Sequence, residues 1–238
     1  MIPKRIHYCW FGKKALPDKA KKCISSWKKF CPDYEIVEWN EDNFDIYQNP
    51  YTIYTYKNNK YAFLSDYARL QIVLQEGGLY FDVDVEVVKS LDELLSHEAF
   101  FGFETSDYVN TGIGFGAVAG NQIVENMLRE YDVLLDGEHG TIGCPMLNTS
   151  ALVKRGLVQD GSKQIIDDAV IYPAQCFNPY DDPTGCLNMT DETYSIHWFA
   201  KSWMDKKTVM RSRLLKPIHR MFGTEIFRKG KWVNETIL

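Results

Sequence analysis

The chain has 238 residues, of which 45% are hydrophobic, so it can form one domain with a sizeable core. Its net charge of −5 argues against a general nucleic-acid-binding protein, and no nucleic-acid partner is expected. The sequence has neither the roughly 18 consecutive apolar residues of a membrane-spanning helix nor the apolar segment of a secretory signal. Six cysteines without a C-x-x-C pair favour a reduced, cytoplasmic protein.

The first third of the chain alternates between strand and helix patterns. Strands are predicted at 5–12, 34–39 and 77–88, helices at 16–30 and 61–78, and a loop with a short helix at 40–60. In the helix 61–78, apolar residues recur every three or four positions from Phe63 to Leu74, which indicates a core-facing stripe. A β-α-β opening of this kind is typical of an α/β fold.

The remainder of the chain continues the alternation without repeats or low-complexity segments. Strands are predicted within 99–105, 112–119, 167–177 and 194–203, and helices within 121–135 and 140–156. We therefore expect one α/β domain over residues 1–203, followed by a tail over residues 204–238.

The tail is basic although the whole chain is acidic. Between Lys201 and Lys231, ten Lys or Arg residues face only two acidic ones, and apolar residues are interleaved with them. Two interpretations remain open. The tail is either a solvated helix or a helix that contacts an acceptor or the anionic inner face of a membrane.

Two carboxylates, Asp82 and Asp84, lie inside the strand predicted for 77–88. Alternate side chains of a strand share a face, so both carboxylates should point one way while Val83 and Val85 face the core. Carboxylates at this spacing repel each other unless a cation or a proton lies between them. Hard divalent ions such as Mg²⁺ or Mn²⁺ prefer these ligands and also bind phosphates. The pair therefore predicts a metal site that holds a diphosphate.

A D-x-D pair has three other interpretations. A calcium-binding EF-hand loop starting at Asp82 requires Gly at its sixth position, where Val87 stands, so it is rejected. A phosphohydrolase with an aspartyl nucleophile usually has Thr or Val where this chain has Glu86. Both aspartates could also be surface residues of an edge strand. The last two interpretations remain open on the D-x-D pair alone.

The preceding helix adds a second pair of charges. Asp66 and Arg69 are three positions apart and so lie on one side of the helix 61–78. They form either a structural ion pair or part of the same cleft, because the helix leads directly into the Asp82 strand.

The string LSDYARLQIVLQEGGLYFDVDV resembles the D-x-D region of glycosyltransferase family 32 and of the related clostridial toxin glucosyltransferases. That pattern has a Ser-Asp-x-x-Arg helix followed by Gly-Gly-x-Tyr-x-Asp-x-Asp. The residues in register are Ser65, Asp66, Arg69, Gly77, Gly78, Tyr80, Asp82 and Asp84. The opening IPKRIHYCWFG and the later IHWFAKSW are similar to further elements of the family, whereas residues from about 120 to 190 match none.

The resemblance implies a GT-A fold, a single α/β domain with a mixed, mostly parallel sheet flanked by helices. Its activity would be the transfer of a hexose or N-acetylhexosamine from a nucleotide sugar, with retention at the anomeric carbon. The cofactor would be Mn²⁺ or Mg²⁺. UDP is expected as the nucleotide, although GDP occurs among relatives. The acceptor would be a glycan or lipid-linked oligosaccharide of a bacterial-type surface polysaccharide.

The resemblance also implies roles for individual residues. Asp82, Asp84 and His197 would bind the metal, and Asp82 would also contact the donor ribose. Asp66 and Arg69 would contact the hydroxyls of the donor sugar. The donor-binding residues would be Trp10, Tyr80, Asp82, Asn110, Ser202 and Trp203.

Several of these residues also have structural interpretations. Trp10 would stack on the nucleobase, or it is a core aromatic at a strand end. Asn110 would orient the donor, or it is a turn residue. His197 would bind the metal, or it is a structural histidine. Ser202 and Trp203 would complete the diphosphate site.

No nucleophile for a retaining reaction is evident, so a front-face displacement assisted by the leaving phosphate is the working hypothesis. A double displacement through Glu104 or Asp107 stays open. The alternative functions are the phosphohydrolase and a non-catalytic module that binds sugar nucleotides.

Overall fold

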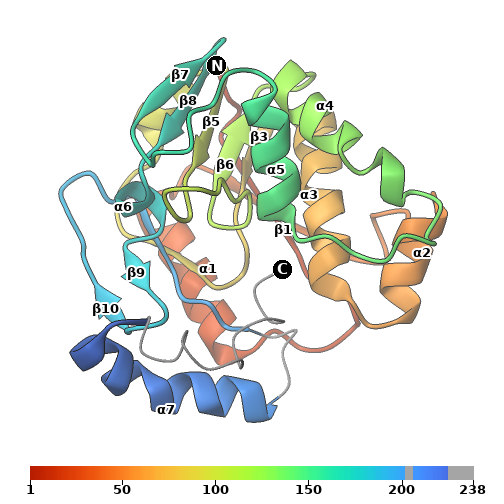
Figure 1. Ribbon diagram of the computed structural model, residues 1–238. Helices are drawn as coiled ribbons and strands as arrows, with labels where there is room; N and C mark the ends of the chain where they lie inside the picture. Colours follow the sequence, from red (N-terminus) through yellow and green to blue (C-terminus); the bar gives the residue numbers. More distant parts are fainter. Residues whose placement is uncertain (202–205, 225–238) are drawn as a thin grey trace.

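The computed structural model describes residues 1–201 and 206–224. In this part of the chain, a seven-stranded sheet runs in the order β2-β1-β3-β6-β5-β8-β7 (Figure 1). Its strands are β1 (Arg5–Cys9), β2 (Glu35–Trp39), β3 (Gly78–Tyr80), β5 (Ala99–Gly102), β6 (Phe115–Ala117), β7 (Gln164–Ile166) and β8 (Ala169–Tyr172). Among the described strands, three neighbouring pairs are parallel and three antiparallel. The expected mixed sheet is confirmed, but parallel pairs do not predominate in it.

Helices cover both faces of this sheet because its strands are apolar on both sides. Adjacent Phe100 and Phe101 point into different hydrophobic cores, as the alternation of side chains along a strand requires. The helices are α1 (Asp18–Phe30), α2 (Pro50–Lys57), α3 (Tyr61–Glu76), α4 (Gln122–Arg129), α5 (Cys144–Val153), α6 (Ala174–Phe177) and the 3₁₀ turns η1 (Asp92–Ser96) and η2 (Asp132–Leu134). One core holds the buried residues of α3, α4 and α5, and the other holds those of α1 and α6.

Helix α3 is buried on most of its surface and leads into the centre of the sheet. Tyr67 and Leu70 of the predicted stripe are buried, whereas Phe63 and Leu74 are half-buried. Asp66 and Arg69 are buried as well.

Two glycines make the passage from α3 to β3 sterically feasible. Gly77 and Gly78 have φ angles of 64° and 108°, a region that side chains disfavour. A Cβ at Gly78 would also lie 2.8 Å from the carbonyl oxygen of Arg5. The chain therefore reverses directly from α3 into β3, next to β1.

The prediction of one continuous strand over 77–88 is wrong. The chain leaves β3 after Tyr80, turns, and resumes as β4 (Val85–Val87), which pairs with β11 (Ser195–His197) in a separate antiparallel sheet. The turn is held because the N–H of Val85 donates to the carbonyl of Asp82 at 3.0 Å. Val85 is buried as expected, but Val83 is only half-buried. The two aspartates therefore share a turn and not the face of a strand.

The later part of the chain contains short elements that the sequence patterns did not separate. Besides β7, these are the hairpin strands β9 (Tyr180–Asp181) and β10 (Cys186–Leu187). The predicted helical tail is present as α7 (Lys206–Phe222), below the hairpin in Figure 1. Among the described residues, no helix combines the length and apolar character needed to cross a membrane.

Candidate active site

A buried arginine on α3 joins the two motifs that the sequence analysis singled out. Arg69, 2% exposed, places Nη2 at 2.8 Å from Asp66 Oδ1 and at 3.0 Å from Asp82 Oδ1. The Tyr80 hydroxyl donates to the same Asp82 oxygen at 3.1 Å, and its ring lies 4.9 Å from the guanidinium carbon of Arg69. Four predicted site residues thus form one hydrogen-bonded cluster at the end of β3.

This cluster carries more negative than positive charge. Burial raises the pKa of Asp66 to about 6, although the charge of Arg69 opposes the shift. Burial also raises the pKa of Asp82, with Arg69 again opposing it and the nearby Asp84 adding to it. One guanidinium therefore faces two carboxylates, with Asp84 nearby, and a further cation would relieve the repulsion among them.

The start of helix α5 completes the cluster from a segment for which the sequence analysis predicted a helix but no role in the site. Arg69 Nη1 donates to Cys144 Sγ at 3.7 Å, and this thiol donates to Asn110 Oδ1 at 3.3 Å. Asn110 Oδ1 also accepts from the N–H of Gly112 at 2.7 Å. Pro145 after Cys144 indicates a helix start, but no local signal shows that this helix start lies beside Arg69.

Gly112 is a second site residue that the sequence analysis did not name. Its carbonyl accepts from the N–H of Asp82 at 3.0 Å. A Cβ at this position would lie 2.4 Å from Asp82 Oδ2 and 2.7 Å from Arg69 Nη1, so any side chain would displace the cluster. The glycine is required by this close approach, which only the folded chain reveals.

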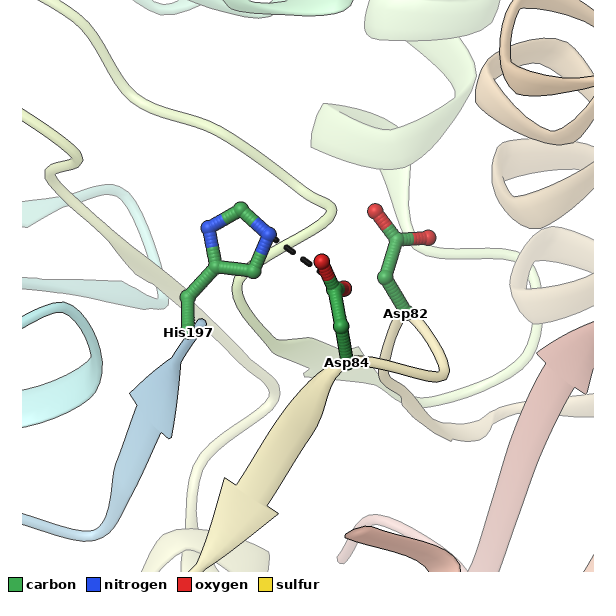
Figure 2. Close-up of side chains that lie close together, drawn as sticks. All are labelled: Asp82, Asp84 and His197. Atoms are coloured by element: carbon green, nitrogen blue, oxygen red, sulfur yellow. Dashed lines mark ion pairs between the residues drawn. The ribbon is translucent and has the colours of Figure 1, made fainter. Parts of the chain in front are cut away.

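Asp84 and His197 meet on the other side of the turn, although they are far apart in the sequence. Antiparallel pairing places His197 opposite Val85, and this brings its Nε2 to 3.4 Å from Asp84 Oδ1 (Figure 2). Asp84 Oδ2 accepts from the N–H of Ala200 at 2.7 Å. His197 Nδ1 is buried without a hydrogen-bond partner among the residues that the structure describes.

The backbone that follows His197 is strained. Phe199 and Lys201 have φ angles of 47° and 53°, which non-glycine residues rarely adopt. Ala200, between them, supplies the N–H group that binds Asp84. Such strain persists only where surrounding contacts maintain it, and it is common at functional sites.

The geometry fits a divalent cation. Asp82, Asp84 and His197 each offer one ligand atom, and these atoms all lie within 4.8 Å of one another. Figure 2 shows the three side chains converging from the turn before β4 and from β11. Burial opposes ionisation of His197, but Asp84 outweighs it and raises its pKa to about 9. Likewise His197, against the effect of burial, lowers the pKa of Asp84 to about 2. Two carboxylates and an imidazole are ligands that Mn²⁺ and similar ions accept.

The structure describes three of the other residues named in the sequence analysis. Trp10 follows β1, which runs parallel to β3, and its half-exposed indole borders a cavity of about 380 Å³. Glu104 is half-buried and Asp107 is exposed. Ser202 and Trp203 lie outside the described residues, so their expected roles remain predictions.

Comparisons with known proteins agree with this geometry. Residues 17–101 match the model of the glycosyltransferase sugar-binding region containing the DXD motif. An uncharacterized glycosyltransferase of Acanthamoeba polyphaga mimivirus is 26% identical over 219 residues, 85% of this chain and 84% of the relative. Inositol phosphoceramide mannosyltransferase 3 of Schizosaccharomyces pombe is 29% identical over 140 residues, 54% of this chain but only 38% of the relative.

A solved structure supports the fold. The PaToxG glycosyltransferase superposes with a TM-score of 0.52 at 23% identity, over 64% of this chain and 69% of that chain. The resemblance and the GT-A fold expected from the sequence are thereby confirmed. The chain is a glycosyltransferase, and its residues 17–101 match the sugar-binding region that contains the DXD motif.

Proposed function

We propose that this chain is a metal-dependent, retaining transferase that moves a hexose or N-acetylhexosamine from a UDP-linked donor to an acceptor hydroxyl. The observation that carries the proposal is the three-ligand cluster of Asp82, Asp84 and His197 beside the buried ion pair of Asp66 and Arg69. A cation site that adjoins a fixed set of carboxylates suits a donor with both a diphosphate and sugar hydroxyls.

The three ligands divide into one fixed and two adjustable groups. Asp82 Oδ1 is held by Arg69 and Tyr80, which leaves Oδ2 for the cation or the donor ribose. Asp84 and His197 contact each other at 3.4 Å and would separate slightly around an ion. Mn²⁺ or Mg²⁺ bound here would stabilise the negative charge that develops on the leaving diphosphate.

Arg69 serves this site by positioning its neighbours. Because it is only 2% exposed and is already bound to Asp66 and Asp82, it has little surface left for a sugar. Asp66, with a side chain 12% exposed, is the better placed of the two to accept a hydrogen bond from a donor hydroxyl. Ser202 and Trp203 remain the candidates for the diphosphate.

The reaction forms a bond between the acceptor oxygen and the anomeric carbon and breaks the bond to the nucleoside diphosphate. In a front-face displacement, the acceptor oxygen attacks the face of the anomeric carbon from which the diphosphate departs, which preserves the configuration. The departing phosphate oxygen takes the acceptor proton. A double displacement would need a carboxylate near the anomeric carbon. Glu104 is the more sheltered of the two candidates for that role, and burial raises its pKa, whereas Asp107 is exposed.

Donor and acceptor classes are proposed from the surroundings of the site. The cavity beside Trp10 has a volume of about 380 Å³, and an indole on its border could stack on a nucleobase. The relative named as an inositol phosphoceramide mannosyltransferase supports a hexose donor and a lipid-borne acceptor. We place the enzyme on the cytoplasmic side of a membrane, in the synthesis of a surface polysaccharide.

The decisive experiment replaces a cation ligand without disturbing the turn. Asp84→Asn keeps an oxygen for the N–H of Ala200 but loses the charge, and we expect transfer from a UDP-sugar with Mn²⁺ to fall at least about 100-fold. The matched control is Glu86→Gln, two positions along, whose carboxylate binds the Trp198 indole. The control should retain transfer, and a thermal melt should show that both variants are still folded at the assay temperature.

The outcome also separates this proposal from the phosphohydrolase. Normal transfer by Asp84→Asn would refute the cation site. Hydrolysis of a simple phosphomonoester, with no turnover of any UDP- or GDP-sugar, would favour the phosphohydrolase instead.

A further inference from the structure

The outermost helix of the molecule is attached to the body through polar side chains. Lys216 on α7 donates to the Tyr180 hydroxyl at 2.7 Å and to Asp182 Oδ1 at 3.0 Å, both next to the hairpin turn. Arg220 donates to the carbonyl oxygens of Thr184 and Gly185 at 3.2 and 3.1 Å. In Figure 1, α7 lies along the edge of the molecule beneath β9 and β10. Its cations therefore form much of the contact with the protein.

The opposite side of α7 is apolar and exposed. Its large apolar residues recur at intervals of three or four, which places them on one side of the helix. They are Met210, Leu214, Ile218, Met221 and Phe222, and the exposed fractions of these side chains run from 37% to 75%. An ordinary surface helix buries its apolar side. Helix α7 has the reverse orientation, and such an exposed patch marks an interaction surface.

The charge of α7 identifies the partner. The helix contains six Lys or Arg residues and no Asp or Glu. Arg211 and Arg213 are exposed; at helical spacing Arg211 lies among the apolar residues, close to Ile218 and Phe222, and Arg213 lies at their border, as long cationic side chains do at a membrane interface. Exposed apolar residues flanked by cations fit the boundary between the headgroups and acyl chains of an anionic bilayer. Because the rest of the chain is acidic, an anionic surface would repel it and so orient the molecule with α7 inward.

The same helix is linked to the cation ligands. Lys201 lies 2.5 Å from Asp182, which also binds Lys216, and it donates to Ser212 of α7 at 2.7 Å. The preceding residue, Ala200, donates its N–H to Asp84. The side chains of this ion-pair group are largely buried, so water screens them less than surface pairs. A surface bound to α7 would therefore be held in a defined position relative to Asp84.

We propose that α7 lies in the interface of an anionic lipid bilayer, with its apolar side inserted and its inner polar side bound to the hairpin. The helix is thus the element that holds the donor site beside the lipid surface. This inference does not depend on the donor or on catalysis, because it concerns binding of the protein alone.

The test is flotation of the full-length protein with vesicles of phosphatidylglycerol and phosphatidylcholine, compared with phosphatidylcholine alone. We expect binding to the anionic vesicles, weaker binding to the neutral ones, and partial loss in high salt. The double variant Leu214→Glu, Met221→Glu should bind at least about tenfold less, because both side chains would be inserted. The matched control is Ile165→Glu on β7, at a position as exposed as Met221, and it should bind like the wild type.

Two results would overturn the proposal. One is equal binding of the double variant and the wild type, since the apolar side would then play no part. The other is absence of vesicle binding together with a wild-type dimer that the double variant dissociates, which would make a second copy of the chain the partner. Circular dichroism of the double variant shows whether α7 still forms.

Discussion

The two sides of the turn after β3 are built differently. On one side, Arg69 forms ion pairs with Asp66 and Asp82 and packs against the ring of Tyr80. All of these residues belong to one helix–turn–strand segment. On the other side, Asp84 meets His197 from a distant strand at 3.4 Å, and His197 Nδ1 has no partner among the described residues. The first side is complete before any ligand binds, whereas the second has the geometry of a site that a cation completes.

The difference has a physical cause. Buried charges need partners within the fold, and on the first side Arg69 pairs with both carboxylates, although one negative charge remains in excess. Placing a second arginine beside Asp84 would block a cation, so that side is held instead by an imidazole, a backbone N–H and a strained turn. Arg69 thus stabilises one half of the site, whereas Asp84 and His197, together with Asp82, have the arrangement of cation ligands.

The largest effect is expected from removing the arginine on the complete side. Arg69→Met keeps much of the volume but leaves Asp66 and Asp82 without their counter-charge. We expect the free energy of unfolding to fall by about 3 kcal/mol, the lower end for a broken buried pair because Asp82 is partly exposed. Urea denaturation measures this change.

The control for this prediction is another arginine with two acidic partners. Arg5 pairs with Glu35 and Glu76 at the surface, and Arg5→Met should cost less than about 1 kcal/mol. Equal losses in the two variants would show that burial of the Arg69 cluster contributes nothing particular to stability.

A smaller effect is expected on the side formed by Asp84 and His197, and it concerns the response to a cation. Mn²⁺ at 100 times its dissociation constant should stabilise the wild type by about 2.7 kcal/mol, which raises the melting temperature by several degrees. In His197→Asn most of this shift should disappear. Without Mn²⁺ the variant should melt below the wild type, because it loses the pair with Asp84, so the two Mn²⁺-induced shifts are compared rather than the two melting temperatures. Differential scanning calorimetry with and without Mn²⁺ gives both values.

A histidine away from the site provides the comparison. His97 contacts the Tyr172 hydroxyl at 2.9 Å and is not among the three ligands, so His97→Asn should keep the full Mn²⁺ shift. If His197→Asn also keeps the full Mn²⁺-induced shift, Asp84 and His197 do not form the cation site.

The smallest effect is expected from His7, a buried histidine of β1 that contacts the carbonyl of Gly77 between α3 and β3. His7 accepts the Trp39 indole N–H at Nδ1 and donates from Nε2 to the carbonyl of Gly77, so it is neutral. Burial lowers the pKa of His7. Below about pH 6.5 the unfolded chain binds a proton at His7 more readily than the folded chain does, so stability falls as the pH falls.

We expect this linkage to cost up to about 1 kcal/mol between pH 7.5 and 5.5. The measurement is the difference in unfolding free energy between the two pH values, in the wild type and in His7→Gln. The variant should lose less on acidification, and an identical pH dependence would mean that His7 is not held neutral by the fold.

Much of the fold could be predicted from local patterns. Long periodic segments such as α3 were located to within two residues, and Asn121 accepts from the N–H groups of Ile123 and Val124, as expected of a helix cap. The prediction of a continuous strand over 77–88 was wrong. The alternation of apolar and acidic residues in this segment is compatible with one long strand and equally with two short strands, β3 and β4, separated by a turn. The break depends on the carbonyl of Gly112, which accepts the N–H of Asp82 from another segment.

The candidate site shows the same limit. Asp66, Arg69, Tyr80 and Asp82 were predicted together, because a family motif records them in one short string. Cys144 and Gly112 were not, since a thiol at a helix start and a glycine in a loop have no local feature that indicates a neighbouring charge cluster.

The sequence by itself determined the local elements, the charge asymmetry of the tail and the need to compensate two adjacent aspartates. These properties depend on residues close together in the chain. Only the tertiary structure decided that Arg69 compensates Asp82 while Asp84 faces His197, and that α7 turns its apolar side outward. Those outcomes depend on strand pairing and helix docking between distant segments. Several such arrangements are equally compatible with the local sequence patterns, and the free energy of packing selects one of them.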